Sequence, residues 1–142
     1  MKSIGIKDIK IGQSVSSKVK ITEDMVMAYA KVTGDFNPQH VDEHFAKESI
    51  FKERIAHGML SVGFISKLLG TELPGMGSIY MSQEVKFLAP VKFNDLIETI
   101  VEVVDIIDGK KVKLRTYCKN QNNEIVIDGF AFIKPPKYSQ GA

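Results

Sequence analysis

With 142 residues, of which 44% are hydrophobic and 25% charged, the chain has the size and composition of one soluble domain, so we expect residues 1–142 to fold around a single apolar core. The formal net charge of +2 is small and the basic residues do not gather on one predicted face, which argues against nucleic acid as a partner. The first ten residues lack the apolar core of a secretory signal, and no stretch approaches the roughly 18 apolar residues of a membrane span, so we expect a cytoplasmic protein without a membrane partner.

The first predicted elements are a strand and a helix. Residues 14–21, SVSSKVKI, are typical of a short strand. Thr22 then predicts the N-cap of a helix, because two acidic residues follow in the first turn, where the helix dipole favours them. Gly34 is placed to end this helix in a left-handed conformation. Its apolar stripe is Met25, Val26, Tyr29, Ala30 and Val32.

Two further helices are predicted before residue 71. The Asn37-Pro38 dipeptide indicates a turn, and a short helix is expected from about Val41 to Glu48. Residues 55–70, IAHGMLSVGFISKLLG, then predict a helix that opens near Gly58. Its apolar residues cover most of its circumference, so we expect it to be buried: Met59, Leu60, Val62, Phe64, Ile65, Leu68 and Leu69.

The rest of the chain has the period of β-strands. Four runs alternate or are rich in β-branched residues, and turn residues separate them: 77–90, 95–107, 110–120 and 124–135. Asp108-Gly109 is a strong signal for a tight hairpin. We predict an antiparallel meander of these four strands, to which the early strand can be added.

A buried helix followed by a long antiparallel sheet predicts an α+β protein with a hot-dog fold, in which the sheet wraps around the central helix. Such a sheet has open edges and one open face that must be covered, so a homodimer or a higher homo-oligomer is expected. Cys118 alternates with apolar residues on the inward face of its strand, which predicts a buried structural thiol rather than a nucleophile.

The most polar stretch is GDFNPQHVDEH, residues 34–44. His40 and His44 fit the H-x-x-E-H pattern of inverted zinc peptidases, in which two histidines one helical turn apart bind the metal. A catalytic zinc site needs a third protein ligand, and Pro38 places His40 at a helix start, where its ring need not share a face with His44. We therefore expect no metal, and a solvated helical face for Asp42, Glu43 and His44.

Asp35 and His40 suggest different chemistry. They are five residues apart, which is wrong for one helical face but allows both side chains to converge across a helix end and a turn. A carboxylate and an imidazole that share a water can accept its proton near neutral pH. The alternative is that Asp35 caps the turn or the next helix and that His40 only partners it, and spacing alone leaves the two interpretations even.

Gly58 adds a third group. As the first residue of the buried helix it carries a free backbone N–H at the positive end of the dipole, where an oxygen that gains negative charge can bind. Together with a water-activating pair, such a donor indicates addition of water to a group conjugated with a carbonyl. The competing explanation is a glycine chosen for tight packing of the helix start.

These residues resemble those of the MaoC-like, R-specific enoyl-CoA hydratases. The similarity covers YAKVTGDFNPQH, FKERIAHGMLSVGFISKLLGTELPG and GSIYMSQEVKFLAPV, and the residues that match the hydratase motif are Tyr29, Gly34, Asp35, Asn37, Pro38, His40 and Ala46. The resemblance implies that Asp35 and His40 activate water, that Gly58 donates to the thioester oxygen, and that Ser66 supports the site. It further implies an acyl-CoA thioester substrate, reversible hydration of a trans-2-enoyl-CoA to an (R)-3-hydroxyacyl-CoA, and no metal or redox cofactor.

Two departures from the family pattern are Gln39, where an aliphatic residue is usual, and Asn94, which replaces a glycine. Neither removes a reacting group. The rival interpretations are an acyl-CoA thioesterase of the same fold and a non-catalytic acyl-binding module. Four apolar residues are candidates for the walls of an acyl pocket: Met25, Phe36, Phe64 and Met76.

Overall fold

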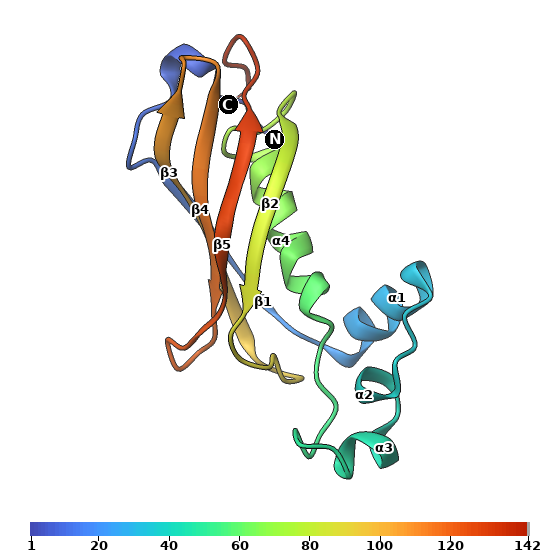
Figure 1. Cartoon of the computed structure of the whole chain (residues 1–142). Coiled ribbons are helices and arrows are strands. Elements are labelled where there is room, and N and C mark those ends of the chain that lie inside the picture. Colours follow the sequence, from blue (N-terminus) through green and yellow to red (C-terminus); the bar gives the residue numbers. More distant parts are fainter. Residues whose placement is uncertain (142) are drawn as a thin grey trace.

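The computed structural model describes residues 1–141, so Ala142, the last residue of the predicted domain, lies outside the described residues (Figure 1). The elements in chain order are η1 (Ile6–Asp8), β1 (Ser14–Lys20), α1 (Glu23–Thr33), α2 (Pro38–Val41), α3 (Glu43–Lys47), α4 (Gly58–Thr71), β2 (Ile79–Phe87), β3 (Leu96–Ile107), β4 (Lys111–Lys119) and β5 (Ile125–Lys134). All five predicted strands are therefore confirmed.

The sheet is antiparallel, with the strand order β1-β3-β4-β5-β2. The hairpin between β3 and β4 turns at Asp108-Gly109, where both residues have positive φ (53° and 61°), as the dipeptide predicts. The predicted four-strand meander is wrong in one respect, because β2 pairs with β5 at the far edge and not with β3. The segment between β2 and β3 contains Pro90 and bridges to Ile55 through Lys92, so it crosses to the helical side and makes no tight turn.

α4 lies along one face of the sheet, and the core fills the space between them (Figure 1). The strands contribute alternate residues to this face, such as Val101, Leu114 and Ala131, each fully buried. The buried face of α4 consists of Ser61, Val62, Ile65, Leu68 and Leu69. A sheet packed against a central helix confirms the hot-dog fold.

The sheet covers α4 on one side only, so the prediction of a helix buried nearly all round is wrong. A stripe along the helix remains exposed, and Met59 keeps 51% of its surface accessible. The members of this exposed stripe are Met59, Gly63, Ser66, Lys67 and Gly70. They follow the helical period, as expected for a helix with one uncovered side.

The short helices lie beyond one end of the sheet, close to the start of α4 (Figure 1). α1 is capped as predicted: Thr22 Oγ1 accepts the N–H of Met25 at 3.2 Å, and Gly34 ends the helix with φ 78°. Val32, however, is 86% exposed and lies outside the buried stripe. The single helix predicted from 41 to 48 is two, because Asp42 is extended (φ −118°, ψ 107°) and its side chain caps α3.

Cys118 is fully buried, with Sγ 3.5 Å from Thr99 Oγ1. Burial raises the pKa of its thiol to about 11, which agrees with a structural role. Within residues 1–141, no helix is long and apolar enough to cross a membrane.

Candidate active site

Asp35 lies at the corner between α1 and α2. Its Oδ1 accepts the backbone N–H of Asn37 at 3.1 Å, and Asn37 in turn caps α2 through Gln39 N at 3.2 Å. Asp35 therefore caps the turn, as one interpretation expects, but only one carboxylate oxygen is used. The other, Oδ2, lies 4.0 Å from His57 Nε2, and the side chain remains 48% exposed. Capping of the turn and a role in the site are thus compatible.

Residues 53–57, which lie between α3 and α4, bind this corner through four hydrogen bonds that involve side chains. Gln39 Nε2 donates to the Glu53 carbonyl at 3.0 Å, and Arg54 Nε donates to the His40 carbonyl at 2.7 Å. The remaining two come from histidine rings and are described below. We call residues 53–57 the strap, because it links α2 to the start of α4. Gln39, which departs from the family pattern, here fastens the corner to the strap.

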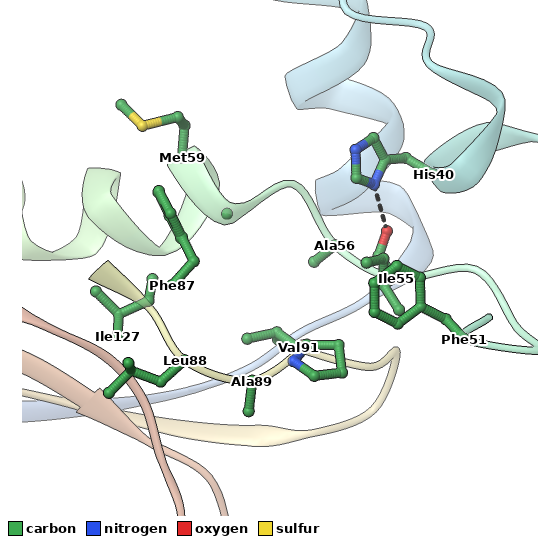
Figure 2. Close-up of a pocket in the computed structure, with 12 residues that line it drawn as sticks. His40, Phe51, Ile55, Ala56, Met59, Phe87, Leu88, Ala89, Val91 and Ile127 are labelled. Atoms are coloured by element: carbon green, nitrogen blue, oxygen red, sulfur yellow. Dashed lines mark hydrogen bonds between the residues drawn. The ribbon is translucent and has the colours of Figure 1, made fainter. Parts of the chain in front are cut away.

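The ring of His40 is oriented by the strap. Its Nδ1 lies 2.8 Å from the carbonyl oxygen of Ile55, drawn as a dashed line in Figure 2. A carbonyl oxygen can only accept, so Nδ1 carries the proton and Nε2 is the basic nitrogen of the neutral ring. Burial lowers the pKa of His40 below 6.5, the Ile55 carbonyl opposes this, repulsion from His57 adds to the lowering, and Asp35 raises it. On balance the ring favours its neutral, proton-accepting form.

The structure brings Asp35 and His40 together, and it adds a residue that the sequence analysis did not select. One side-chain ligand atom from each of Asp35, His40 and His57 lies within 4.8 Å of the others. The His40 and His57 rings stack at 4.0 Å, with 30° between their planes. His44, the second histidine of the zinc pattern, is exposed on α3. The histidine that gathers with His40 is thus His57 and not His44.

One carboxylate and two imidazoles this close together could hold a metal ion, so the hydrogen bonds that occupy their atoms matter. His40 Nδ1 and His57 Nε2 each donate to a backbone carbonyl, at 2.8 and 3.0 Å. A nitrogen that carries a donated proton has no lone pair for a metal, so only His40 Nε2 and His57 Nδ1 remain as possible ligand atoms of the rings. This geometry favours a hydrogen-bonded cluster over a metal centre.

Gly58 and His40 both line a cavity of about 480 Å³. Its walls are apolar and come from residues 51–59, residues 87–91 and Ile127 (Figure 2). Gly58 begins α4, so its N–H has no acceptor within the helix. The alternative explanation for this glycine also holds, since a Cβ at Gly58 would come within 2.5 Å of the Phe87 ring. The volume suits a small-molecule site that surrounds an apolar chain.

Ser66, the fourth predicted site residue, is not brought together with the other three in this chain. It lies two turns beyond Gly58, about 12 Å along the axis at 1.5 Å per residue, on the exposed stripe of α4. The four residues proposed for an acyl pocket, Met25, Phe36, Phe64 and Met76, do not line the cavity either.

The sequence matches the model of the MaoC like domain over residues 7–124. The chain belongs to this MaoC-like family. It is 46% identical over 131 residues to the "(R)-specific enoyl-CoA hydratase" of Rhodospirillum rubrum, covering 92% of this chain and 90% of that protein. It is 42% identical over 132 residues to the "3-hydroxybutyryl-CoA dehydratase" of Methylorubrum extorquens, covering 92% of this chain and 83% of that protein.

Among solved structures, the MaoC-like chain is similar to R-hydratase PhaJ1 from Pseudomonas aeruginosa in the unliganded form. The TM-score is 0.93 at 37% identity, with 98% of this chain and 90% of that chain covered. The fold and its family are thus established together.

Sequence reasoning missed His57 and Arg54 as parts of the site. Arg54 contacts α2, α1 and the segment between β2 and β3: it bonds the His40 carbonyl, lies 3.4 Å from Glu23 Oε1 and stacks over Phe93 at 4.9 Å. His57 directly precedes Gly58, and this adjacency was the one available signal. The contacts of both residues are long-range, so periodicity could not reveal them.

Proposed function

We propose that this MaoC-like protein catalyses the reversible hydration of a trans-2-enoyl-CoA to an (R)-3-hydroxyacyl-CoA. The observation that carries the proposal is the meeting of Asp35 and His40 beside a cavity that the Gly58 amide also lines. The activities named for relatives at 46% and 42% identity support the substrate class, and the name of the first also supports the R configuration of the product.

In the proposed mechanism, one water molecule binds between Asp35 Oδ2 and His40 Nε2. The Nδ1–H bond to Ile55 keeps Nε2 unprotonated, so the pair can accept a proton from the water. The hydroxyl adds to C3, and a proton from the pair is delivered to C2, so the pair ends with the protons it began with. The reverse sequence is dehydration.

As the hydroxyl adds, negative charge develops on the thioester oxygen. The Gly58 N–H, at the positive end of α4, would donate to this oxygen. A preorganised donor of this kind contributes on the order of 100-fold in rate. The apolar walls around residues 87–91 would hold the acyl chain, and none of these steps needs a metal or a redox cofactor.

We also propose that the protein acts as a homodimer or higher homo-oligomer of one-domain chains in the cytoplasm. β2 is an edge strand, and large apolar side chains on and beside it are exposed: Ile79 (55%), Met81 (53%), Phe87 (53%) and Leu88 (56%). Such an edge next to the uncovered stripe of α4 is a surface that a second copy can bury. Ser66 lies on that stripe, so we propose that it supports the site from within the interface.

Incubation with crotonyl-CoA, with the enoyl absorbance and free thiol followed together, tests the function. Loss of the enoyl absorbance without thiol release, and formation of the (R)-3-hydroxy product, are expected. Thiol release without hydration would indicate a thioesterase instead. Binding of crotonyl-CoA without turnover would indicate a non-catalytic acyl-binding module.

A further inference from the structure

His57 occupies the N-cap of α4 without acting as a cap. N-cap positions favour Ser, Thr, Asp or Asn, whose side chains accept a free N–H of the first turn. His57 makes no such bond. Its ring is instead turned toward the corner between α1 and α2, and only 2% of the residue is exposed. Capping of α4 therefore does not explain why a histidine occupies this position.

The His57 ring contacts both residues of the proposed water-activating pair, Asp35 and His40, and also Tyr29. Nε2 lies 3.0 Å from the backbone carbonyl oxygen of Asp35, so it donates a hydrogen bond across 22 residues of sequence. One face stacks on the His40 ring at 4.0 Å, and the Tyr29 ring lies 4.5 Å away at 47°. The next residue in the chain is Gly58, whose amide is the proposed oxyanion donor.

Stability alone does not account for a histidine here. Its Nδ1 is buried and has no hydrogen-bond partner among residues 1–141. A buried polar atom without a partner is destabilising, whereas an apolar ring of similar size could stack on the same neighbours at no such cost. A contribution to the site is needed to explain the polar ring, and the Nε2 bond to Asp35 is the contact that an apolar ring would lose.

We propose that His57 is a positioning residue of the site: its Nε2–H bond to the Asp35 carbonyl and its stacking on His40 hold the carboxylate and the imidazole at a fixed distance from the Gly58 amide. The inference rests on the proposed hydratase activity. His57 itself exchanges no proton with substrate. It acts by keeping Asp35, between α1 and α2, His40 of α2 and Gly58 of α4 in one geometry, and small displacements of such groups lower turnover strongly.

Two substitutions separate the two contacts of the ring. His57→Phe keeps an aromatic ring for stacking but removes the donor. His57→Gln removes the ring but keeps an N–H donor as many bonds from the backbone as His57 Nε2. We expect His57→Phe to lower kcat for crotonyl-CoA hydration about 10- to 100-fold with KM little changed, because the reacting groups are displaced. His57→Gln should recover most of that loss. His44→Phe, at an exposed histidine of α3, is the matched control and should leave kcat unchanged.

A double-mutant cycle tests whether the effect passes through Asp35. If His57 acts by placing that carboxylate, His57→Phe should reduce kcat little further in an Asp35→Asn background. General loss of structure would lower kcat by the same factor in both backgrounds. Should His57→Phe fail to fold, as judged by its thermal melt, His57→Asn replaces it, since its shorter amide does not extend to the Asp35 carbonyl.

The inference is overturned if kcat is unchanged in the folded His57→Phe or His57→Asn variant, if only KM rises, or if the loss is equal in the Asp35→Asn background. An active wild-type protein with any of these outcomes removes the inference and leaves the proposed function intact. A wild-type protein that does not hydrate crotonyl-CoA removes the proposed function and this inference with it.

Discussion

His40 illustrates how a single backbone contact selects a chemical role. The Ile55 carbonyl accepts a hydrogen bond from Nδ1–H at 2.8 Å, which leaves Nε2 as the basic nitrogen that we propose activates the water. The same strap bonds Asp35 through His57 and the His40 carbonyl through Arg54. In the proposed mechanism, reactivity at the corner therefore depends on residues that need never touch the substrate.

The pKa of His40 predicts how the activity depends on pH. Burial lowers this pKa below 6.5, and the ring must be neutral to accept a proton. As the pH falls through the lowered pKa, His40 becomes protonated and kcat/KM should decline. We expect the midpoint of the acidic limb of the kcat/KM profile to lie below pH 6.5. A midpoint at or above that value would contradict the assignment of His40 as the base.

The hydrogen bonds of the two histidine rings predict that activity does not depend on a bound metal. Each ring donates one N–H to a backbone carbonyl, so that nitrogen cannot bind a metal, and Asp35 Oδ1 accepts the Asn37 N–H. Prolonged treatment with EDTA should therefore leave the hydration rate unchanged, and metal analysis should find less than one equivalent. Stoichiometric zinc, with activity lost to the chelator and restored by zinc, would show that Asp35, His40 and His57 form a metal centre.

At the scale of elements, the close approach of β2 to β5 depends on Gly129. A Cβ at this position would lie 1.8 Å from the backbone oxygen of Glu84. Backbone cannot yield as a flexible side chain can, so Gly129→Ala should separate the two strands. We expect a loss of about 2–4 kcal/mol in the free energy of unfolding, measured by urea denaturation.

The control for Gly129→Ala is Ser16→Ala, on the opposite edge strand β1, where the side chain is exposed. This change should alter the free energy of unfolding by less than about 0.5 kcal/mol. Equal stability of the two variants would mean that β2 does not approach β5 as closely as described.

Much of the element order follows from local chemistry, and the exceptions have physical causes. Thr22, Gly34 and Asp108-Gly109 act on their immediate neighbours, so their effects could be predicted. The split between α2 and α3 arises from an extended Asp42 within an otherwise helical pattern. The pairing of β2 with β5 is a choice among strands of similar character, which alternation cannot make.

The candidate site was predictable to a similar extent. Asp35, His40 and Gly58 could be found because their residue types and spacing fit one reaction and one family pattern. His57 and Arg54 could not, because their importance arises from contacts with residues distant in the chain. The exposure of Ser66 follows from the uncovered side of α4, which a pattern of apolar residues does not reveal.

At the scale of the whole molecule, the exposed apolar side chains along the edge strand β2 have no packing partner that explains them within residues 1–141 of one chain. Association through this edge predicts that the protein elutes at twice the mass of the chain or more in size-exclusion chromatography with light scattering. Met81→Lys places a charge on this edge and should shift the protein toward monomer, because burying an unpaired charge is unfavourable. Ser16→Lys, on the opposite edge β1, should not. A monomeric wild type would refute the proposed assembly.

The most direct test of the central claim is the turnover of crotonyl-CoA by wild type, Asp35→Asn and His40→Asn. Asparagine at 35 keeps an oxygen for the Asn37 N–H, and asparagine at 40 keeps a donor for the Ile55 carbonyl, so both variants preserve the corner while removing the base. We predict that each lowers kcat by about 100-fold or more, whereas the controls Asp24→Asn and His44→Ala do not. Rates near that of wild type in both Asp35→Asn and His40→Asn would contradict water activation by this pair.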